Sequence, residues 1–294
     1  MRIVILFFIS FITIASRAQD TLAVINKKRL IPVATGALGI YTASMVGLNE
    51  LWYKNNPRSS FRFFDDSHEW KQMDKLGHAV TAFHESRFAV DVLRWSGVPQ
   101  RKAYLIGGLA GFVFQTPIEF LDAYSPEYGF SWSDVAANAS GSLLVIGQYL
   151  AWEELRIQPK FSFHQTKFAK ERPNVLGKSF NEQLLKDYNG QTYWLSFNIY
   201  SFLRDKRSNF PKWLNVSLGY SAENMLYAQD SQNKEAGYVP YRQYFLSLDI
   251  DFTKIRTRSR VVNFILDYGF NILHVPSPAL EYSRKGIKFH AIYF

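Results

Sequence analysis

The stretch LIPVATGALGIYTASMVGL, from Leu30 to Leu48, contains no charged residue in 19 positions. A helix of about 20 predominantly apolar residues is long enough to cross the hydrocarbon core of a bilayer. Three basic residues, 27–29, precede the stretch, and Trp52 and Tyr53 follow where interfacial aromatic side chains would lie. We therefore expect a membrane-inserted helix here. The alternative is a buried core helix of a soluble bundle.

The composition narrows the function classes. Of the 294 residues, 47% are hydrophobic and 17% aromatic, which is enough for a folded core. The absence of Cys excludes disulfides, zinc–thiolate sites, iron–sulfur clusters and a thiol nucleophile. The net charge is +9, of which +7 falls in residues 153–294. This distribution favours membrane lipid or an anionic envelope polymer as partner, and no nucleic-acid-binding motif is present. The sequence identifies no protein partner.

The first 18 residues predict a secretory signal peptide. Met1-Arg2 supplies the positive start, an apolar run follows over residues 3–14, and Ser16 and Ala18 provide small residues before a cleavage site at Gln19. An uncleaved anchor is the alternative. The expected location is the cell envelope of a Gram-negative bacterium, membrane-associated on the periplasmic side. The sequence does not distinguish the inner from the outer membrane.

Three more helices are expected in the front half. Their predicted ranges are Trp70–Trp95, Arg101–Tyr124, and a fourth helix from Ser131 or Ser133 to about Trp152. Gly107 and Gly111 form a small-xxx-small pair that allows close helix packing, and Pro117 predicts a kink.

The back half alternates apolar and polar residues with the period of a strand. The predicted strands are 193–200, 214–220, 244–252 and 286–294, with a loop or short helix over 161–188 and a helix over 260–273. Only about five strands are visible, and the smallest outer-membrane barrel needs about eight. We therefore predict an α+β chain: a signal peptide (1–18), a membrane-associated bundle of about four helices (19–158), and a basic, β-rich region (159–294) that forms a small sheet.

Polar residues recur at helical spacing in the otherwise apolar front half. The stripes are Asp74, His78, Thr81 and Glu85; Gln115, Glu119 and Asp122; and Asp134, Asn138 and Gly141. A buried carboxylate costs several kcal/mol unless it is paired or binds a cation. Three interpretations stay open. In the first, a divalent metal is bound by Asp74, His78, Glu119 and Asp134. In the second, His78 and either Glu119 or Asp122 form a general acid/base pair. In the third, Lys75 and arginines neutralise the carboxylates in a structural network.

Three segments carry a resemblance to a known family. They are Asp74–His78 (DKLGH), Pro117–Asp122 (PIEFLD) and Gly129–Asn138 (GFSWSDVAAN). Over about residues 28–155 the chain resembles a family of unknown function whose members are described as predicted periplasmic, YfiM-like lipoproteins. It is more distantly similar to VanZ-like membrane proteins. The resemblance implies an exported envelope protein with no assigned activity. The lack of Cys leaves no residue for lipidation, so the helices would have to provide the membrane anchor.

Two functions follow from these observations. The first is a non-enzymatic envelope protein with a scaffold or binding role. The second is an envelope hydrolase or transferase acting on lipid or cell-wall precursors. If the polar stripes bind a divalent metal, that metal would be its cofactor. Its candidate site comprises Asp74, His78, Glu119, Asp122, Asp134 and Asn138. A cluster open to a cleft would favour the enzyme, whereas a cluster closed by Lys75 and arginines would favour the scaffold.

Overall fold

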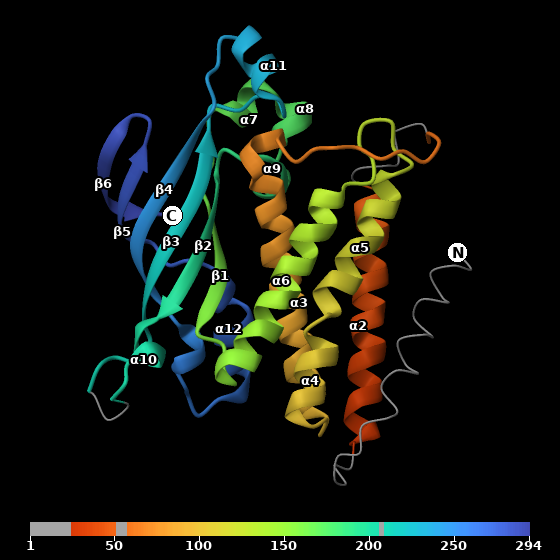
Figure 1. Cartoon of the computed structure of the whole chain (residues 1–294), viewed down its shortest axis with the longest axis vertical. Coiled ribbons are helices and arrows are strands. Elements are labelled where there is room, and N and C mark those ends of the chain that lie inside the picture. The colour runs from red at the N-terminus through yellow and green to blue at the C-terminus, as the bar shows by residue number, and fades with distance from the viewer. Residues whose placement is uncertain (1–24, 51–57, 206–208) are drawn as a thin grey trace.

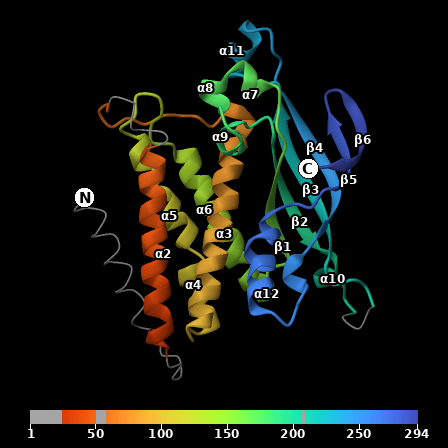
Figure 2. The same ribbon diagram turned by 180° about the vertical axis from the view of Figure 1, so that it is seen from behind.

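The computed structural model describes residues 25–50, 58–205 and 209–294. A bundle of helices and an antiparallel sheet lie side by side (Figure 1). Seen from behind, α12 lies between the lower parts of the bundle and the sheet (Figure 2). The predicted α+β class is confirmed. The expected signal peptide, together with Trp52 and Tyr53, falls outside the described residues.

The bundle contains α2 (Lys27–Leu48), α3 (Met73–Trp95), α4 (Gln100–Gly107), α5 (Ala110–Asp122) and α6 (Trp132–Trp152). The third expected helix is therefore divided in two. The interruption lies at Gly108–Leu109, and Pro117 lies within α5. At the break, a Cβ on Gly108 would lie 2.5 Å from Cγ1 of Ile146, so the glycine lets the chain approach α6.

Helix α3 is the centre of the bundle and contacts α4, α5 and α6. Two glycines bring its neighbours close: a Cβ on Gly111 would lie 1.9 Å from the carbonyl oxygen of Ala82, and one on Gly141 would lie 2.1 Å from that of Ala79. Gly107 packs similarly against Val90, so the expected close approach at the glycine pair is confirmed. The apolar core between these helices includes Phe83, Val90, Ala103, Tyr104 and Val145.

The chain enters α3 through three residues in the left-handed region. Trp70, Lys71 and Gln72 have φ values of 46°, 52° and 65°, so the helix begins at Met73 and the prediction of Trp70 as its start is wrong. Left-handed backbone is unfavourable for residues other than glycine and persists where the surroundings hold it. Three hydrogen bonds stabilise this segment. Trp70 N donates to Ala228 O (2.9 Å), Tyr220 Oη to Lys71 O (2.6 Å), and Arg242 Nη2 to Gln72 Oε1 (2.6 Å).

Six strands pair antiparallel in chain order. They are β1 (Ile157–Phe163), β2 (Gln191–Asn198), β3 (Leu214–Glu223), β4 (Tyr241–Ile250), β5 (Ser277–Ser283) and β6 (Gly286–Tyr293). The sequence did not predict β1 or β5, and part of the expected loop 161–188 is therefore a strand. Short helices occupy the connections: α7 (Phe168–Glu171), α8 (Pro173–Leu176), α9 (Phe180–Lys186), α10 (Ile199–Phe202), α11 (Asp230–Glu235) and α12 (Arg260–Tyr268).

The sheet is rolled, and most of its inward residues are polar, beside one apolar cluster of Trp194, Phe245, Ala279 and Tyr293. Oγ1 of Thr192 on β2 lies 3.0 Å from Oη of Tyr293 on β6, although a flat sheet would separate these strands by roughly 19 Å. Inside the roll, Lys160 Nζ lies 2.7 Å from Asp249 Oδ2, and neither side chain is exposed. Along β4, inward residues are buried while outward residues such as Leu246 are about half exposed. The polarity is the reverse of that in a water-soluble sheet.

A pair of glycine variants on α6 tests the close helix contact. We expect Gly141→Ala to lower the thermal midpoint of the purified chain, because the added Cβ would collide with the α3 backbone and force α6 away. Gly147→Ala is the matched control: nothing lies within 4 Å of its added Cβ, and alanine favours a helix. Equal midpoints for the two variants would contradict the packing.

Candidate functional site

A group of polar side chains gathers at the end of the bundle where α3 and α6 begin and α5 ends. We call it the Lys75 cluster, and its members are Asp66, Asp74, Lys75, His78, Glu119, Asp134 and Asn138. Asp74 and Asp134 occupy the first turns of α3 and α6, where the helix dipole favours negative charge. Ser131 is the N-cap of α6, as expected, because its Oγ accepts a hydrogen bond from Asp134 N at 3.1 Å.

Lys75 is the centre of the cluster. Its Nζ lies 2.7 Å from Asp66 Oδ2, 2.8 Å from Asp134 Oδ1 and 3.0 Å from Asp74 Oδ2. An ammonium group has three N–H donors, so each carboxylate can receive one. Burial alone would lower the pKa of Lys75, but the carboxylates of Asp74 and Asp134 raise it above its ordinary value. The lysine therefore stays charged and holds the starts of two helices and a loop together.

Asp66 reaches the cluster from the loop before α3. Its Oδ1 accepts hydrogen bonds from Ser131 Oγ at 2.6 Å and Ser133 Oγ at 2.7 Å, while Lys75 contacts the other oxygen. Burial by itself would raise the pKa of Asp66, but the hydrogen bonds from Lys75 and the two serines lower it overall. Ser131 and Ser133 thus serve as a cap and as donors to Asp66.

His78 lies between two pairs of acceptors. Its Nδ1 is 3.0 Å from Asn138 Oδ1 and 3.9 Å from Glu119 Oε1. Its Nε2 is 3.9 Å from Asp134 Oδ1 and 4.0 Å from Asp74 Oδ1. When Nδ1 carries the proton it donates to Asn138, and Nε2 then faces the two aspartates. The side chain is 16% exposed, so the ring is largely shielded from water.

The cluster carries more negative than positive charge. Asp66, Asp74 and Asp134 surround one lysine, whereas burial, and next the charge of Asp134, raise the pKa of Glu119 beside His78 to about 9, so that this carboxyl group holds a proton. Burial, and next the charge of Asp74, raise the pKa of Asp134 to about 7. Burial opposes ionisation of Asp74 as well, but His78, Lys75 and a hydrogen bond from Tyr188 Oη (2.8 Å) lower its pKa. The cluster therefore retains a proton on Asp134 in preference to Asp74.

Three buried atoms in the cluster lack hydrogen-bond partners among the described residues: Oε1 of Glu119, Nδ2 of Asn138 and Oδ1 of Asp134. Asp134 Oδ1 still forms the ion pair with Lys75, whereas Glu119 and Asn138, both fully buried, have no such partner for these atoms. Oε2 of Glu119 is approached only distantly, by Ser131 N at 3.4 Å. Buried polar atoms are normally satisfied, so the atoms of Glu119 and Asn138 mark the part of the cluster where a proton, a water molecule or a cation would improve the fit.

Five of the six candidate residues meet around His78: Asp74, Glu119, Asp134 and Asn138 lie within 4.0 Å of its ring nitrogens. Asp122, the sixth, adds to the rise in the pKa of Glu119, after burial and the charge of Asp134. Thr81 and Glu85 continue the α3 stripe away from the cluster, where Glu85 Oε1 accepts from Gln115 Nε2 at 2.9 Å. Sequence reasoning missed Asp66 and Tyr188.

Three of the four proposed metal ligands are close enough to share an ion. One ligand atom from each of Asp74, His78 and Asp134 lies within 4.8 Å of the others, and Glu119 is the next neighbour of His78. The donor set suits a divalent metal. However, the ammonium of Lys75 already contacts both aspartates, and its positive charge opposes a metal ion at that position.

Residues 62–149 match the model of a family described as predicted periplasmic lipoprotein (DUF2279). The matched segment contains every member of the Lys75 cluster but none of the strands. Comparisons with curated proteins and with solved structures found no match. The family match supports an exported protein of the cell envelope. The sequence has no Cys to carry a lipid, so it departs from the lipoprotein part of that description.

The role of Lys75 can be tested with two lysine variants. We expect Lys75→Met to destabilise the chain by about 3 to 5 kcal/mol, because it leaves buried carboxylates without their cation. Lys71→Met is the control, since its partner Asp230 is about half exposed and can be hydrated; its cost should stay below about 1 kcal/mol. Denaturant unfolding in detergent would measure both, and similar costs would refute a central role for Lys75.

Asp134 predicts a pH dependence of stability. A carboxyl group whose pKa is higher in the folded chain binds its proton more tightly there, so its contribution is full at low pH. That contribution is lost as the pH rises from about 4 toward the folded value of about 7. Asp134→Asn should therefore show a smaller fall in thermal midpoint between pH 5 and pH 7 than the parent chain. Parallel profiles would contradict the raised pKa.

Proposed function

We propose that this chain is a non-enzymatic envelope protein whose helical bundle is seated in a lipid bilayer, and whose Lys75 cluster fixes the helices at one end. The observation that carries this proposal is α2. It has 22 residues, and none of them is buried. Leu38 and Ile40 are 58% and 72% exposed, and a helix this apolar is not stable against water on its open sides.

The attachment of α2 to the bundle is narrow. Tyr41 stacks obliquely on Phe114 with ring centroids 5.1 Å apart, and its Oη donates to the Phe114 carbonyl oxygen at 3.1 Å. Most of the helix surface is left for another apolar phase. The stretch Gln100–Asp122 also has the length and hydropathy of a membrane span and is only 33% buried over its most apolar window. Exposed side chains on α6, such as Leu143 and Leu150, extend the same surface.

The Lys75 cluster favours a structural role within this arrangement. Its carboxylates are drawn toward a lysine that is 11% exposed, and the serines of α6 satisfy Asp66. The network joins a loop, α3 and α6, and Tyr188 connects it to the segment that leads into β2. These contacts fix helix register at the polar end of a bundle whose sides are apolar. A scaffold or binding role follows, with membrane lipid as the first partner.

Fractionation tests the membrane seating. We expect the mature chain to sediment with membranes, to stay there after alkaline carbonate extraction and to dissolve in detergent. A variant with Leu38→Glu and Ile40→Glu should weaken this retention, because charges on a lipid-facing helix are costly. Lys234→Glu on exposed α11 is the matched control and should fractionate like the parent. Recovery of the parent in the soluble periplasmic fraction would reject membrane seating.

A second candidate function rests on the surplus negative charge and on the two unpartnered atoms of Glu119 and Asn138. In this alternative the cluster is the site of an envelope hydrolase or transferase, with Asp74, His78 and Asp134 holding a divalent metal, or with His78 and Glu119 exchanging a proton. Such chemistry would suit lipid or cell-wall precursors presented at a membrane surface. The lysine at the centre of the cluster is the observation against it.

A double-mutant cycle on His78→Ala and Glu119→Gln distinguishes the two functions. For a structural network we expect a coupling above about 0.5 kcal/mol that is unchanged by a chelator, and no stoichiometric metal in protein purified without chelator. A bound metal together with coupling that disappears on chelation would favour the metal-dependent alternative. Strict additivity would show that the two side chains do not act together.

A further inference from the structure

We propose that the outward face of the rolled sheet, from β2 to β6, lies in the hydrocarbon core of the same bilayer as the helices. This inference rests on the proposed membrane seating of the bundle and extends it to the half of the chain that the family match does not cover. The outward face is defined by Leu195, Leu218, Tyr244, Leu246, Leu248, Leu280, Tyr282, Ile287 and Phe289.

The strand register places aromatic side chains in one row across the sheet: Phe161, Tyr193, Tyr220, Tyr244 and Tyr282. Tyr193 and Tyr220 pack against the start of α3, so the open part of the row begins at Tyr244. Tyr244 and Tyr282 are about half exposed or more, with their rings on the outward face. A belt of tyrosines at one level is typical of the boundary between lipid tails and headgroups. Arg242 lies outward on β4 one step beyond this row, on the side away from the leucines.

The next outward row is purely apolar. Stepping two residues along each strand from the tyrosines, the paired positions are Pro159, Leu195, Leu218, Leu246, Leu280 and Phe289. Four of these, Leu218, Leu246, Leu280 and Phe289, are between 47% and 64% exposed. Beyond them come Phe197, Val216 and Leu248. Together these rows form a continuous apolar surface next to the tyrosine row. Exposing such a surface to water is unfavourable in free energy.

The inward face supplies the complementary half of the pattern. Ser196, Ser217 and Ser247 lie opposite one another on the inner side of β2, β3 and β4, and all three are buried. Sheets with lipid outside alternate apolar-out and polar-in, whereas sheets with water outside do the opposite. The height of the sheet also fits: from the tyrosine row, the seven residues Tyr244–Ile250 of β4 span about 24 Å, close to the apolar band of about 25 Å on membrane barrels.

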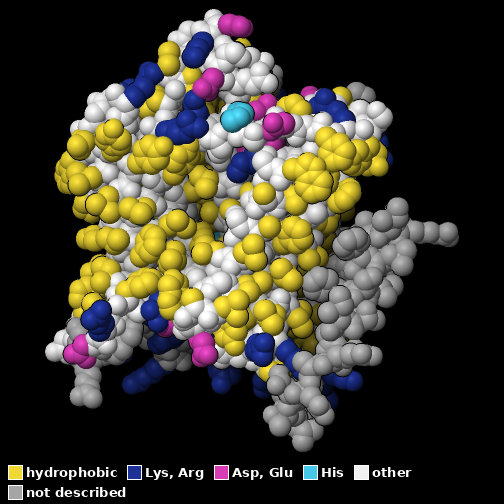
Figure 3. Space-filling view, viewed as in Figure 1, with side chains coloured by type: hydrophobic (Ala, Val, Ile, Leu, Met, Phe, Trp, Pro, Cys, Tyr) yellow, Lys and Arg dark blue, Asp and Glu magenta, His cyan; other side chains and the backbone are white. Residues whose placement is uncertain are grey.

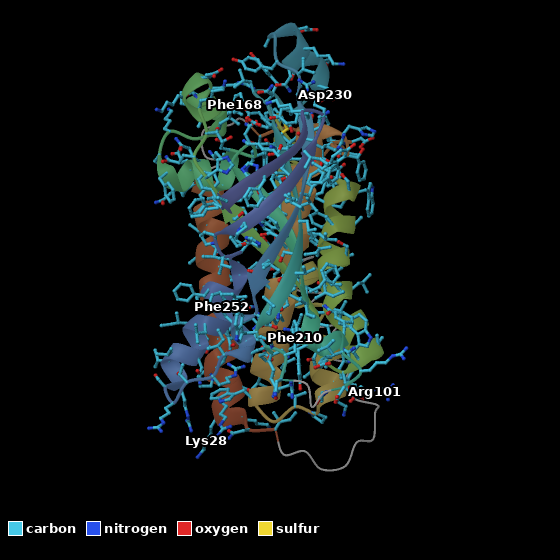
Figure 4. The ribbon with its side chains drawn as sticks, turned by 90° about the vertical axis from the view of Figure 1, so that its left-hand side faces the viewer. Lys28, Arg101, Phe168, Phe210, Asp230 and Phe252 are labelled. Atoms are coloured by element: carbon cyan, nitrogen blue, oxygen red, sulfur yellow. The ribbon has the colours of Figure 1, made fainter. Side chains whose placement is uncertain are left out.

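The charges lie where a bilayer would place them. The space-filling view shows a broad apolar band, with charged side chains gathered at its two ends (Figure 3). Lys28 and Arg101 mark the end opposite Asp230 (Figure 4). Tryptophans cluster with them, because α3 ends at Trp95, α6 ends at Trp152, and Trp213 precedes β3. Basic and aromatic residues at this end complement anionic headgroups.

Open strand edges are unfavourable in lipid, and the fold limits them. At β1, the carbonyl oxygen of Pro159 lies 2.9 Å from His84 Nε2 of α3, and Phe161 forms a bridge to Leu273. At the other edge, β6 curls inward so that Tyr293 meets β2, as the hydroxyl contact to Thr192 shows. The β1 edge is therefore covered by protein, whereas β6 meets another strand only at its end, Tyr293.

Single cysteines test the proposal, since the chain contains none of its own. The full chain is reconstituted into phosphatidylcholine and phosphatidylglycerol vesicles as Leu246→Cys on the sheet, Leu38→Cys on α2 or Lys234→Cys on α11, each labelled with an environment-sensitive fluorophore. Quenching is measured with lipids that carry nitroxides at the middle of the acyl chain, and with aqueous iodide. We expect the label at 246 to lose fluorescence to the nitroxide lipid as the label at 38 does, while the label at 234 responds to iodide.

The outcomes separate the two proposals. If the labels at 38 and 246 both respond to iodide and not to the lipid quencher, membrane seating and the sheet inference both fail. If only the label at 38 is quenched by lipid, the bundle is seated and the sheet inference is overturned. A label at 246 that is shielded from both quenchers would also overturn it, because a second copy or another protein then covers the sheet. A label at Tyr282→Cys should be quenched most by a nitroxide near the lipid headgroup. Stronger quenching by the mid-chain nitroxide would contradict the placement of the tyrosine row at the boundary between tails and headgroups.

Discussion

The polarity of the rolled sheet is the constraint on which the rest of the structure depends. Most side chains in its interior form hydrogen bonds, and the apolar part of the interior is a small cluster of Trp194, Phe245, Ala279 and Tyr293. The deepest contact of the sheet, between Lys160 and Asp249, removes two charges from water. The associated hydrogen bonds, from Lys160 Nζ to Ile250 O at 2.6 Å and from Ser196 Oγ to Asp249 Oδ2 at 2.6 Å, offset that cost. Hydrophobic stabilisation of the sheet therefore comes from that apolar cluster and from the contact of the sheet with the start of α3.

The Lys75 cluster lies at the junction of the two halves. Met73, at the start of α3, packs with Ala222 and Met225 from the end of β3 and the turn beyond it. Tyr188 donates to Asp74 from the segment that precedes β2. The cluster is therefore more than an internal feature of the bundle, because its charge balance also positions the sheet. This connection explains why polar residues of the family-matched segment are completed by a tyrosine outside that segment.

Much of this fold is visible in the sequence because it follows local periodicity. Alternation revealed β2, β3, β4 and β6, uncharged runs revealed α2 and the α4–α5 region, and Gly97 and Pro99 marked the end of the charged α3. The prediction failed at β1, whose core is interrupted by Pro159 and Lys160, and at β5, where Pro276 and Pro278 suggested a terminus. Alternation alone does not say which face is inside, since leucine and serine alternate equally in a soluble sheet and in a lipid-facing one.

Part of the candidate site could also be predicted from the sequence, again because local periodicity places residues on a shared face. Helical spacing grouped Asp74 with His78, and Asp134 with Asn138, because those pairs share a face at i and i+4. It left open whether Lys75 and arginines neutralise the carboxylates, because spacing does not show where a long side chain ends; the structure places the Lys75 ammonium against three aspartates. Asp66 and Tyr188 come from loops whose paths are set by tertiary contacts, which spacing does not describe.

The left-handed segment before α3 has a consequence for how the chain assembles. Each strand pairs with the next strand in the sequence, and the bundle helices α2 to α6 pack through contacts within about 80 residues, whereas α12 reaches α3 across 177 residues. Residues 70–72 also have distant partners: their strained backbone is held by Tyr220, Ala228 and Arg242, about 150 to 170 residues later. The first turn of α3 therefore acquires its native geometry only after β3 and β4 have docked. Assembly of the Lys75 cluster thus becomes a late event, coupled to completion of the C-terminal half.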